Sequence, residues 1–200
     1  MFKAVVQAVP ERAKSIKSIK EALFPLVGDN VILHIDGDRR GPYGSFSDLL
    51  KKYTSEDEYM MYMQDDILFA DNYKEKLMAH YEKCREMGWD YLGLFAPNRK
   101  DITEAYNNGV EYYRFKSIWM QACFISPKFQ KLLREGLEDY SRTTTNTKSN
   151  DAYVDFIIKK YKLEEIYVCL PSLVQHDMSI PSSISHSRSA TRMSNLFNVK

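Results

Sequence analysis

Short apolar runs alternate along the chain with longer segments in which apolar residues recur every three or four positions. The short runs predict strands at 3–9, 31–35, 58–63, 89–96 and 164–171, with one or two more between 112 and 126. The amphipathic segments predict helices at 11–24, 46–53, 72–87, 126–140 and 150–161, and polar segments predict loops at 36–45, 97–111 and 142–150. Because strands alternate with helices through the first two-thirds, we expect an α/β fold with a mostly parallel sheet flanked by helices.

Proline, glycine and serine mark several of the predicted helix boundaries. Pro25 and Gly28 should end the first helix. Ser126 has the side chain of an N-cap residue, and Pro127 suits the first helical position because that residue needs no N–H donor.

Length and composition indicate an ordinary soluble protein. We expect residues 1–200 to form a single domain, with a C-terminal tail or lid from about 177 to 200. Lys and Arg number 28 against 27 Asp and Glu, so the net charge of +1 gives no broad attraction to nucleic acid or membranes. The three cysteines show no disulfide or zinc spacing, and no apolar stretch is long enough to span a membrane.

Acidic residues and a histidine come just after the predicted strands. Asp36 and Asp38 follow the second strand, Asp65 and Asp66 follow the third, and His176 follows the last strand and a proline turn. Open parallel sheets bind their ligands at the carboxyl ends of the strands. The sequence therefore predicts a polar site at that edge of the sheet.

The paired carboxylates of MQDDILF are the strongest single signal. Two buried like charges repel each other and lose solvation, and a divalent cation is a common group that offsets this cost. A solvated pair that caps the following turn is the alternative for Asp65 and Asp66. His176 can be a second ligand, since imidazole suits Mn²⁺, if it converges on Asp66; otherwise it is an ordinary histidine.

Two acids on a predicted helix are candidates for a general base. Asp151 and Asp155 lie four residues apart, so they share one face of the helix at 150–161. Either can remove a proton from a hydroxyl nucleophile. As the alternative, Asp151 is an ordinary acid at a helix start, where the helix dipole stabilises it.

Further candidates would contact a nucleotide. Val9 is the last residue of the first predicted strand and Arg12 follows it; with Asp36 they can frame a base and a ribose, although an exposed arginine after such a strand is also ordinary. The Ser-rich C-terminal segment can donate hydrogen bonds to a diphosphate, as a lid, or can be a flexible polar tail. Its candidate donors are Ser182, Ser183, His186 and Arg188.

Several other chemistries have no support in the sequence. The chain has no GxxxxGK[ST], GxGxxG, HExxH or GxSxG motif. Its four histidines show no arrangement that fits a hydrolase triad.

The order of AVPER, HIDGD, MQDDILF, WMQACFISPKFQKLL, NDAYVDFII and LPSLVQHDMSIPSSI resembles that of small GT-A-type nucleotide-sugar glycosyltransferases. It is similar to families with a Glu-Asp-Asp metal motif, such as lipooligosaccharide glycosyltransferases and the N-acetylglucosaminyltransferase IV type. Gln64 stands here where that motif has its first acid. The resemblance implies a GT-A-like, Rossmann-type sheet, with Asp66 and His176 as ligands of Mn²⁺ or Mg²⁺. It places Asp65 near the sugar or ribose and Asp151 as the base of an inverting transfer.

The implied reaction moves a sugar from a nucleotide-diphosphate donor, with UDP-sugars as the first choice, to an acceptor hydroxyl. Trp119 and Gln121 are expected to contact the acceptor, which can be a saccharide, a protein or a modified DNA base; for Trp119 the alternative is a packing residue. A cytoplasmic enzyme of a bacterium or a virus-infected cell fits this pattern. The alternatives are a nucleotidyltransferase, whose usual Gly-rich N-terminal loop is missing, and a non-catalytic protein that binds nucleotide sugars. The oligomeric state is left open.

Overall fold

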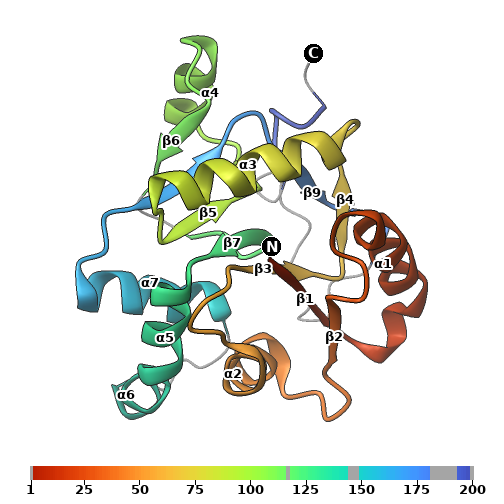
Figure 1. Ribbon diagram of the computed structural model, residues 1–200, viewed down its shortest axis with the longest axis vertical. Coiled ribbons are helices and arrows are strands. Elements are labelled where there is room, and N and C mark those ends of the chain that lie inside the picture. The colour runs from red at the N-terminus through yellow and green to blue at the C-terminus, as the bar shows by residue number, and fades with distance from the viewer. Residues whose placement is uncertain (1, 116–117, 144–148, 181–192, 199–200) are drawn as a thin grey trace.

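The computed structural model describes residues 2–115, 118–143, 149–180 and 193–198. The main sheet has strands β1 at Lys3–Ala8, β2 at Val31–Ile35, β3 at Met60–Gln64, β5 at Tyr91–Gly93, β6 at Tyr112–Arg114, β7 at Ala122–Ile125 and β8 at Ile166–Cys169. Their order is β2-β1-β3-β7-β5-β8-β6 (Figure 1). Five strands run in one direction, and β7 and β6 run in the other. The predicted α/β fold with a mostly parallel sheet is confirmed.

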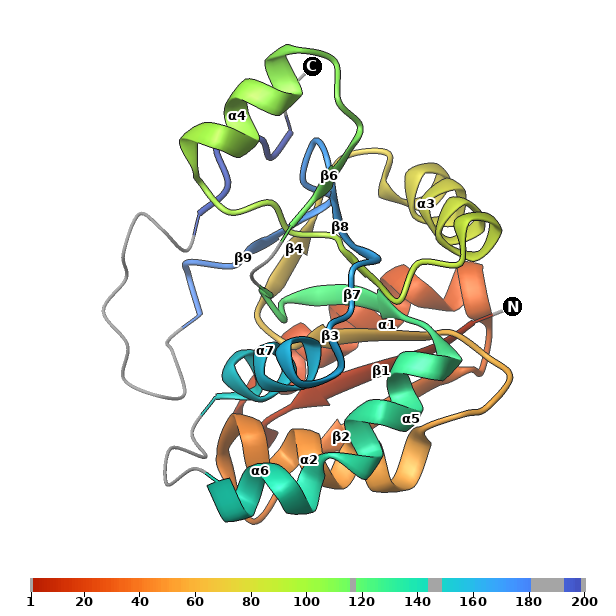
Figure 2. The ribbon, with the colours of Figure 1, turned by 90° about the vertical axis from the view of Figure 1, so that its left-hand side faces the viewer.

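Helices cover both faces of this sheet (Figure 2). They are α1 at Ala13–Val27, α2 at Gly41–Tyr53, α3 at Tyr73–Met87, α4 at Lys100–Asn107, α5 at Pro127–Glu135, α6 at Leu137–Thr143 and α7 at Asn150–Tyr161, with a 3₁₀ turn, η1, at Pro10–Arg12. α1 and α3 pack on one face, and α2, α5, α6 and α7 pack on the other. The two-sided cover explains why strands such as β1 are apolar without alternation.

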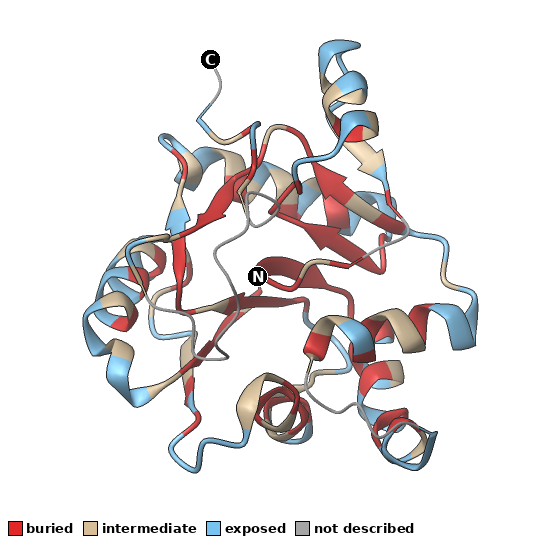
Figure 3. Cartoon of the chain, turned by 180° about the vertical axis from the view of Figure 1, so that it is seen from behind, coloured by how far each residue is buried: buried red, intermediate tan, exposed pale blue. Residues whose placement is uncertain are grey.

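Alternating side chains of β1 enter the two halves of the core. Ala4 and Val6 belong to the cluster that contains Leu23 of α1, whereas Val5 belongs to the cluster that contains Phe46 of α2. The central strands are consequently buried almost throughout (Figure 3). This two-sided packing fixes the strand ends, and with them the residues that follow each strand.

A second, two-stranded sheet was not predicted. It pairs β4 at Ile67–Phe69 with β9 at Val174–His176 in antiparallel register (Figure 2). Three-residue strands carry too few positions for an apolar pattern to be recognised. Their pairing brings the segment after β3 beside the segment after β8.

Three helix predictions need correction at their ends. α1 continues through Pro25 to Val27 and ends at Gly28, because burial of Leu23 and Val27 stabilises the last turn. α2 begins at Gly41 rather than residue 46, since a proline is tolerated in a first turn. The helix predicted at 126–140 is divided into α5 and α6 at Gly136, where the side chain of Ile157 packs too close to leave room for a Cβ atom.

The loop predicted at 97–111 is wrong, because residues 100–107 form the helix α4. Ile102 is fully buried in a third cluster with Phe115, Val168 and Leu196. Ala105 and Tyr106 follow Ile102 at helical spacing and pack against the same cluster, so the segment carries a short helical pattern that the loop prediction overlooked. Tertiary packing of this short apolar side therefore stabilises the helix.

Part of the predicted tail packs on the body of the protein. The Ser194 hydroxyl lies 2.8 Å from that of Ser172, and the Ser194 N–H donates to Gln175 Oε1 at 2.9 Å. Residues 181–192, the centre of the predicted lid, lie outside the described residues. Among the described helices, none is both long and apolar enough to cross a membrane.

Candidate active site

The adjacent aspartates lie at the corner where the chain passes from the main sheet to the small one. Gln64 is the last residue of β3 and Ile67 the first of β4. Asp65 is 3% exposed and Asp66 is 8% exposed, so the pair is not solvated. The charge of the two carboxylates must therefore be offset by protein groups or by a ligand.

Groups that follow β1 supply part of this compensation. The Val9 N–H donates to Asp65 Oδ2 at 2.8 Å, and the Arg12 guanidinium pairs with Asp65 Oδ1. The same guanidinium nitrogen lies 3.2 Å from Asp66 Oδ2. Burial raises the pKa of Asp65, while the Val9 hydrogen bond and Arg12 lower it. The structure thus brings together Val9, Arg12 and Asp65, three residues that the sequence selected.

His176 converges on Asp66, as its predicted role requires. The β4–β9 register places His176 opposite Ile67, the residue after Asp66. His176 Nδ1 lies 3.6 Å from Asp66 Oδ1, and the imidazole is almost fully buried. The Asp177 N–H also donates to the main-chain oxygen of Asp66 at 2.8 Å, which ties the two segments together.

The donor set at this corner fits a cation held by two protein ligands. In the described part of the chain, no group of three or more His, Cys, Asp or Glu side chains is placed to hold a metal ion. Asp66 Oδ1 and His176 Nδ1, 3.6 Å apart, can both reach one ion through bonds of about 2.1 Å. One carboxylate and one imidazole suit Mn²⁺ better than Mg²⁺. Water and phosphate oxygens commonly complete such a site.

Gln121 reaches the same corner from the neighbouring strand. It precedes β7, which runs against β3, so it lies at the carboxyl edge of the parallel strands. The Gln64 N–H donates to the Gln121 main-chain oxygen at 2.8 Å. Gln121 Nε2 lies 3.0 Å from His176 Nε2, and the residue is 5% exposed. Gln121 therefore faces His176, and its predicted contact with an acceptor stays a prediction.

The two candidate bases lie on α7 and bind the backbone that leads into β7. Asp151 Oδ1 accepts the Met120 N–H at 2.7 Å, and Asp155 Oδ1 accepts the Ile118 N–H at 3.2 Å. Burial raises the pKa of Asp155, and the Ile118 hydrogen bond lowers it. A higher pKa makes a carboxylate a stronger proton acceptor. Asp151 and Asp155 therefore have a structural contact each, beside the catalytic role predicted for them.

Asp36 and Trp119 lie at the border of this cluster. Both carboxylate oxygens of Asp36 accept main-chain N–H groups, from Arg40 at 2.8 Å and Gly41 at 2.9 Å, so Asp36 stabilises the start of α2. The half-buried ring of Trp119 lies 5.9 Å from the ring of Phe95, centre to centre. A ribose contact for Asp36 and an acceptor contact for Trp119 stay predictions.

The remaining nucleotide contacts predicted from the sequence cannot be placed in this cluster. They lie outside the described residues: Ser182, Ser183, His186 and Arg188.

Sequence reasoning missed a supporting contact and a buried network. The Ser15 hydroxyl donates to the main-chain oxygen of Asp65, and its only sequence signal is its place one helical turn after Arg12. The Tyr62 hydroxyl donates to Gln7 Oε1 at 2.6 Å and accepts from Asn150 Nδ2 at 2.9 Å. This network joins the start of α7 to β1 and β3, and no local pattern marks it.

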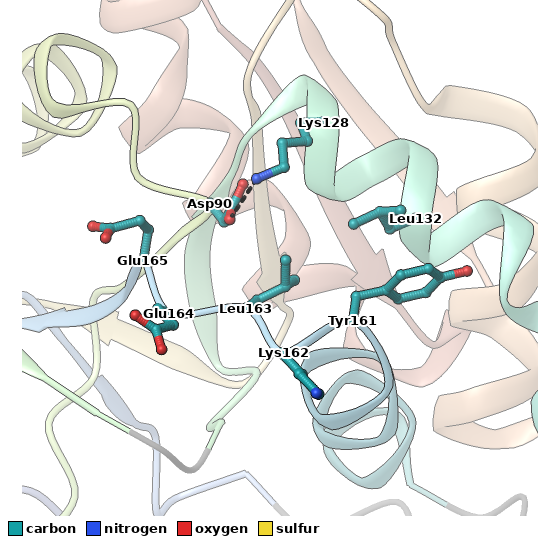
Figure 4. Close-up of a pocket in the computed structure, with 8 residues that line it drawn as sticks. All are labelled: Asp90, Lys128, Leu132, Tyr161, Lys162, Leu163, Glu164 and Glu165. Atoms are coloured by element: carbon teal, nitrogen blue, oxygen red, sulfur yellow. Dashed lines mark hydrogen bonds and ion pairs between the residues drawn. The ribbon is translucent and has the colours of Figure 1, made fainter.

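A cavity lies at the opposite edge of the sheet. It has a volume of about 470 Å³ and is lined by Asp90, Lys128, Leu132, Tyr161, Lys162, Leu163, Glu164 and Glu165 (Figure 4). Asp90 precedes β5 and Glu165 precedes β8, so the cavity is at the amino ends of the parallel strands. The Asp90 carboxylate is paired there with Lys128 at 3.2 Å. None of the predicted site residues lines this cavity.

Comparison with known proteins adds structural likeness only. No family model matches the chain, and no curated protein matches it in sequence. The chain is similar to the solved structure of a mannose-1-phosphate geranyltransferase from Thermus thermophilus, with 14% identity and a TM-score of 0.43, over 84% of this chain and 73% of that one. It is also similar to the galactosyltransferase LgtC in complex with donor and acceptor sugar analogs, with 12% identity and a TM-score of 0.47, over 94% and 91%. Likeness at this level does not establish a shared activity.

Proposed function

We propose that this chain is a metal-dependent glycosyltransferase that moves a sugar from a nucleotide-diphosphate donor to an acceptor hydroxyl with inversion. The observation that carries the proposal is the convergence of Asp65, Asp66 and His176, from two distant segments, with Arg12 at the carboxyl edge of the sheet. A buried pair of acids beside a histidine is the arrangement that the sequence resemblance to GT-A-type glycosyltransferases implies for a donor site. A UDP-sugar is the first donor to test.

In the proposed reaction, Asp66 and His176 would hold Mn²⁺, which when bound would neutralise charge on the diphosphate leaving group. Val9 and Arg12 fix the orientation of Asp65 toward the donor. Asp151 or Asp155 accepts the proton of the acceptor hydroxyl as that oxygen attacks the anomeric carbon. Attack opposite the departing diphosphate inverts the anomeric configuration.

Two basic residues near this edge are already paired. Arg39 pairs with Glu11, and Arg40 pairs with Asp48. Because these two guanidinium groups already have carboxylate partners, they offer less charge to a DNA backbone, so saccharide and protein acceptors come before DNA in a screen. A steep loss of acceptor affinity with added salt would reverse that order.

Calorimetric titration with UDP tests the donor site directly. We expect UDP to bind the natural protein with Mn²⁺ and to bind little after EDTA. In Asp66→Asn we expect the affinity for UDP to fall by more than the 10- to 100-fold typical of residues that only hydrogen-bond to a metal ligand. Asp57→Asn, an exposed carboxylate before β3, is the control and should bind UDP normally. If UDP, GDP, CDP and TDP all fail to bind the natural protein with Mn²⁺, the proposal is refuted.

A second assay separates catalysis from binding alone. Metal-dependent hydrolysis of a UDP-sugar by the natural protein, lost in Asp66→Asn, would support an enzyme. Tight UDP binding without any turnover of donor, across a panel of acceptors, would instead support a nucleotide-sugar-binding protein.

A further inference from the structure

The contact between Gln121 and His176 raises a question of proton placement. Gln121 Nε2 and His176 Nε2 are 3.0 Å apart, which is hydrogen-bond distance. Two nitrogens form such a bond only if one carries hydrogen and the other offers a lone pair. In this orientation the glutamine donates, and His176 Nε2 is the acceptor. A neutral imidazole then carries its proton on Nδ1, which faces Asp66 Oδ1.

That tautomer cannot bind a cation on the Asp66 side. A metal ligand must offer the lone pair of Nδ1, so the proton of the neutral ring must lie on Nε2. The group facing Nε2 must then accept a hydrogen bond. Within the described residues, the other end of the amide, Gln121 Oε1, is buried and has no hydrogen-bond partner. Half a turn of the amide would bring this oxygen to Nε2.

We propose that Gln121 is the positioning residue that sets the tautomer of His176, donating to Nε2 in the cation-free protein and accepting from Nε2 when a divalent cation lies between Asp66 and Nδ1. The inference rests on the cation site of the proposed function. The change requires that Nδ1 release a proton to solvent and that Nε2 take one up. No other atom of the ring has to move.

The choice of residue type follows from the two states. An amide offers both a donor and an acceptor on nearly the same shape, so glutamine can pair with either tautomer. A carboxylate at this position only accepts, and a thioether does neither well. Replacing a residue that hydrogen-bonds to a metal ligand typically changes the affinity for the metal by about 10- to 100-fold. Gln121→Glu should therefore keep cation binding, and Gln121→Met should weaken it within that range.

Nitrogen NMR of the imidazole provides a readout without donor or turnover. Protein with ¹⁵N-labelled histidine is examined at about pH 8.5, where an ordinary imidazole is neutral, with EDTA and then with Zn²⁺ as a diamagnetic stand-in for Mn²⁺. We expect His176 to carry its proton on Nδ1 with EDTA and on Nε2 with Zn²⁺. His176→Asn assigns the signals. The Nε2–H tautomer in both conditions would overturn the inference.

Titration of Mn²⁺, with and without UDP, then compares Gln121→Met and Gln121→Glu with the natural protein. The control is Gln175→Met, which removes another buried glutamine that hydrogen-bonds Ser194 N–H rather than the imidazole. Normal Mn²⁺ affinity in Gln121→Met, with loss in Asp66→Asn, would overturn the role of Gln121 and leave the proposed function intact. Absence of Mn²⁺ binding in the natural protein would overturn both, whereas weakening in Gln121→Met and not in Gln175→Met supports the inference.

Discussion

Replacement of Arg12 tests how far its charge stabilises the buried carboxylates of Asp65 and Asp66. Its guanidinium pairs with Asp65 Oδ1 and lies 3.2 Å from Asp66 Oδ2. The side chains of Arg12, Asp65 and Asp66 are 10%, 5% and 11% exposed, respectively, so little water screens them. Arg12→Met keeps the length of the aliphatic stem and removes the charge. The two buried carboxylates would then lie close together without the guanidinium group that compensates their charge.

Loss of one partner from a buried ion pair costs about 3–5 kcal/mol, because the remaining charge is left uncompensated. The Val9 N–H still donates to Asp65 Oδ2 in the variant, which reduces the penalty. We therefore expect Arg12→Met to lower the free energy of unfolding by about 2–4 kcal/mol. For a chain of this length, the melting temperature would fall by roughly 10 °C.

Urea unfolding in EDTA, followed by circular dichroism, measures this difference. Arg39→Met is the control, since its pair with Glu11 is exposed and should contribute about 0–1 kcal/mol. Asp65→Asn made in both backgrounds completes a double-mutant cycle, in which the asparagine should recover part of the stability lost in Arg12→Met. An Arg12→Met protein as stable as Arg39→Met would refute the reasoning, because the carboxylates would then be compensated by something else.

Two further predictions concern hydrogen bonds that connect α7 to the rest of the protein. Burial raises the pKa of Asp155 in the folded protein. The protonated side chain therefore contributes stability below the pKa of about 3.9 that it has in the unfolded chain, and this contribution is lost as the pH rises through the pKa of the folded protein. The free energy of unfolding of the natural protein relative to Asp155→Asn should therefore decrease from about pH 4 upward in urea titrations, and a constant difference would contradict the shift. Tyr62→Phe should cost about 1–3 kcal/mol in the same assay, because it leaves buried groups of Gln7 and Asn150 without their partner, and a cost near zero would show that they find another.

The sequence was sufficient to predict which residues would share an edge. Arg12 and Asp65 follow β1 and β3, which are parallel neighbours, so their meeting follows from the strand pattern and the rule for parallel sheets. The same argument placed Asp36 at that edge. It did not show that both oxygens of Asp36 are bound to the start of α2, because that depends on the path of the 37–41 turn.

The contacts of His176 and Gln121 depended on tertiary structure. His176 meets Asp66 only because the three-residue strands β4 and β9 pair across more than a hundred residues of chain. Gln121 enters only because β7 inserts antiparallel between β3 and β5. Neither pairing leaves a local apolar period in the sequence. The helix α4 is a different case, because Ile102, Ala105 and Tyr106 do recur at helical spacing and the prediction overlooked so short a pattern.

The segment 118–121 joins the two halves of the candidate site. The Met120 N–H is bound by Asp151 on α7, and the next side chain, Gln121, contacts His176 at the acidic corner. Met120 and Gln121, which are adjacent in the chain, are therefore held by two different parts of the candidate site. The distance between Asp151, the candidate base, and the proposed cation is set by this peptide connection as well as by packing. The structural contact of Asp151 and the catalytic role proposed for it are separable, because accepting an N–H needs only an oxygen lone pair, whereas accepting a proton needs a carboxylate. An asparagine can fill the first role and cannot fill the second, which is why loss of transfer without loss of fold is the signature of a base at this position.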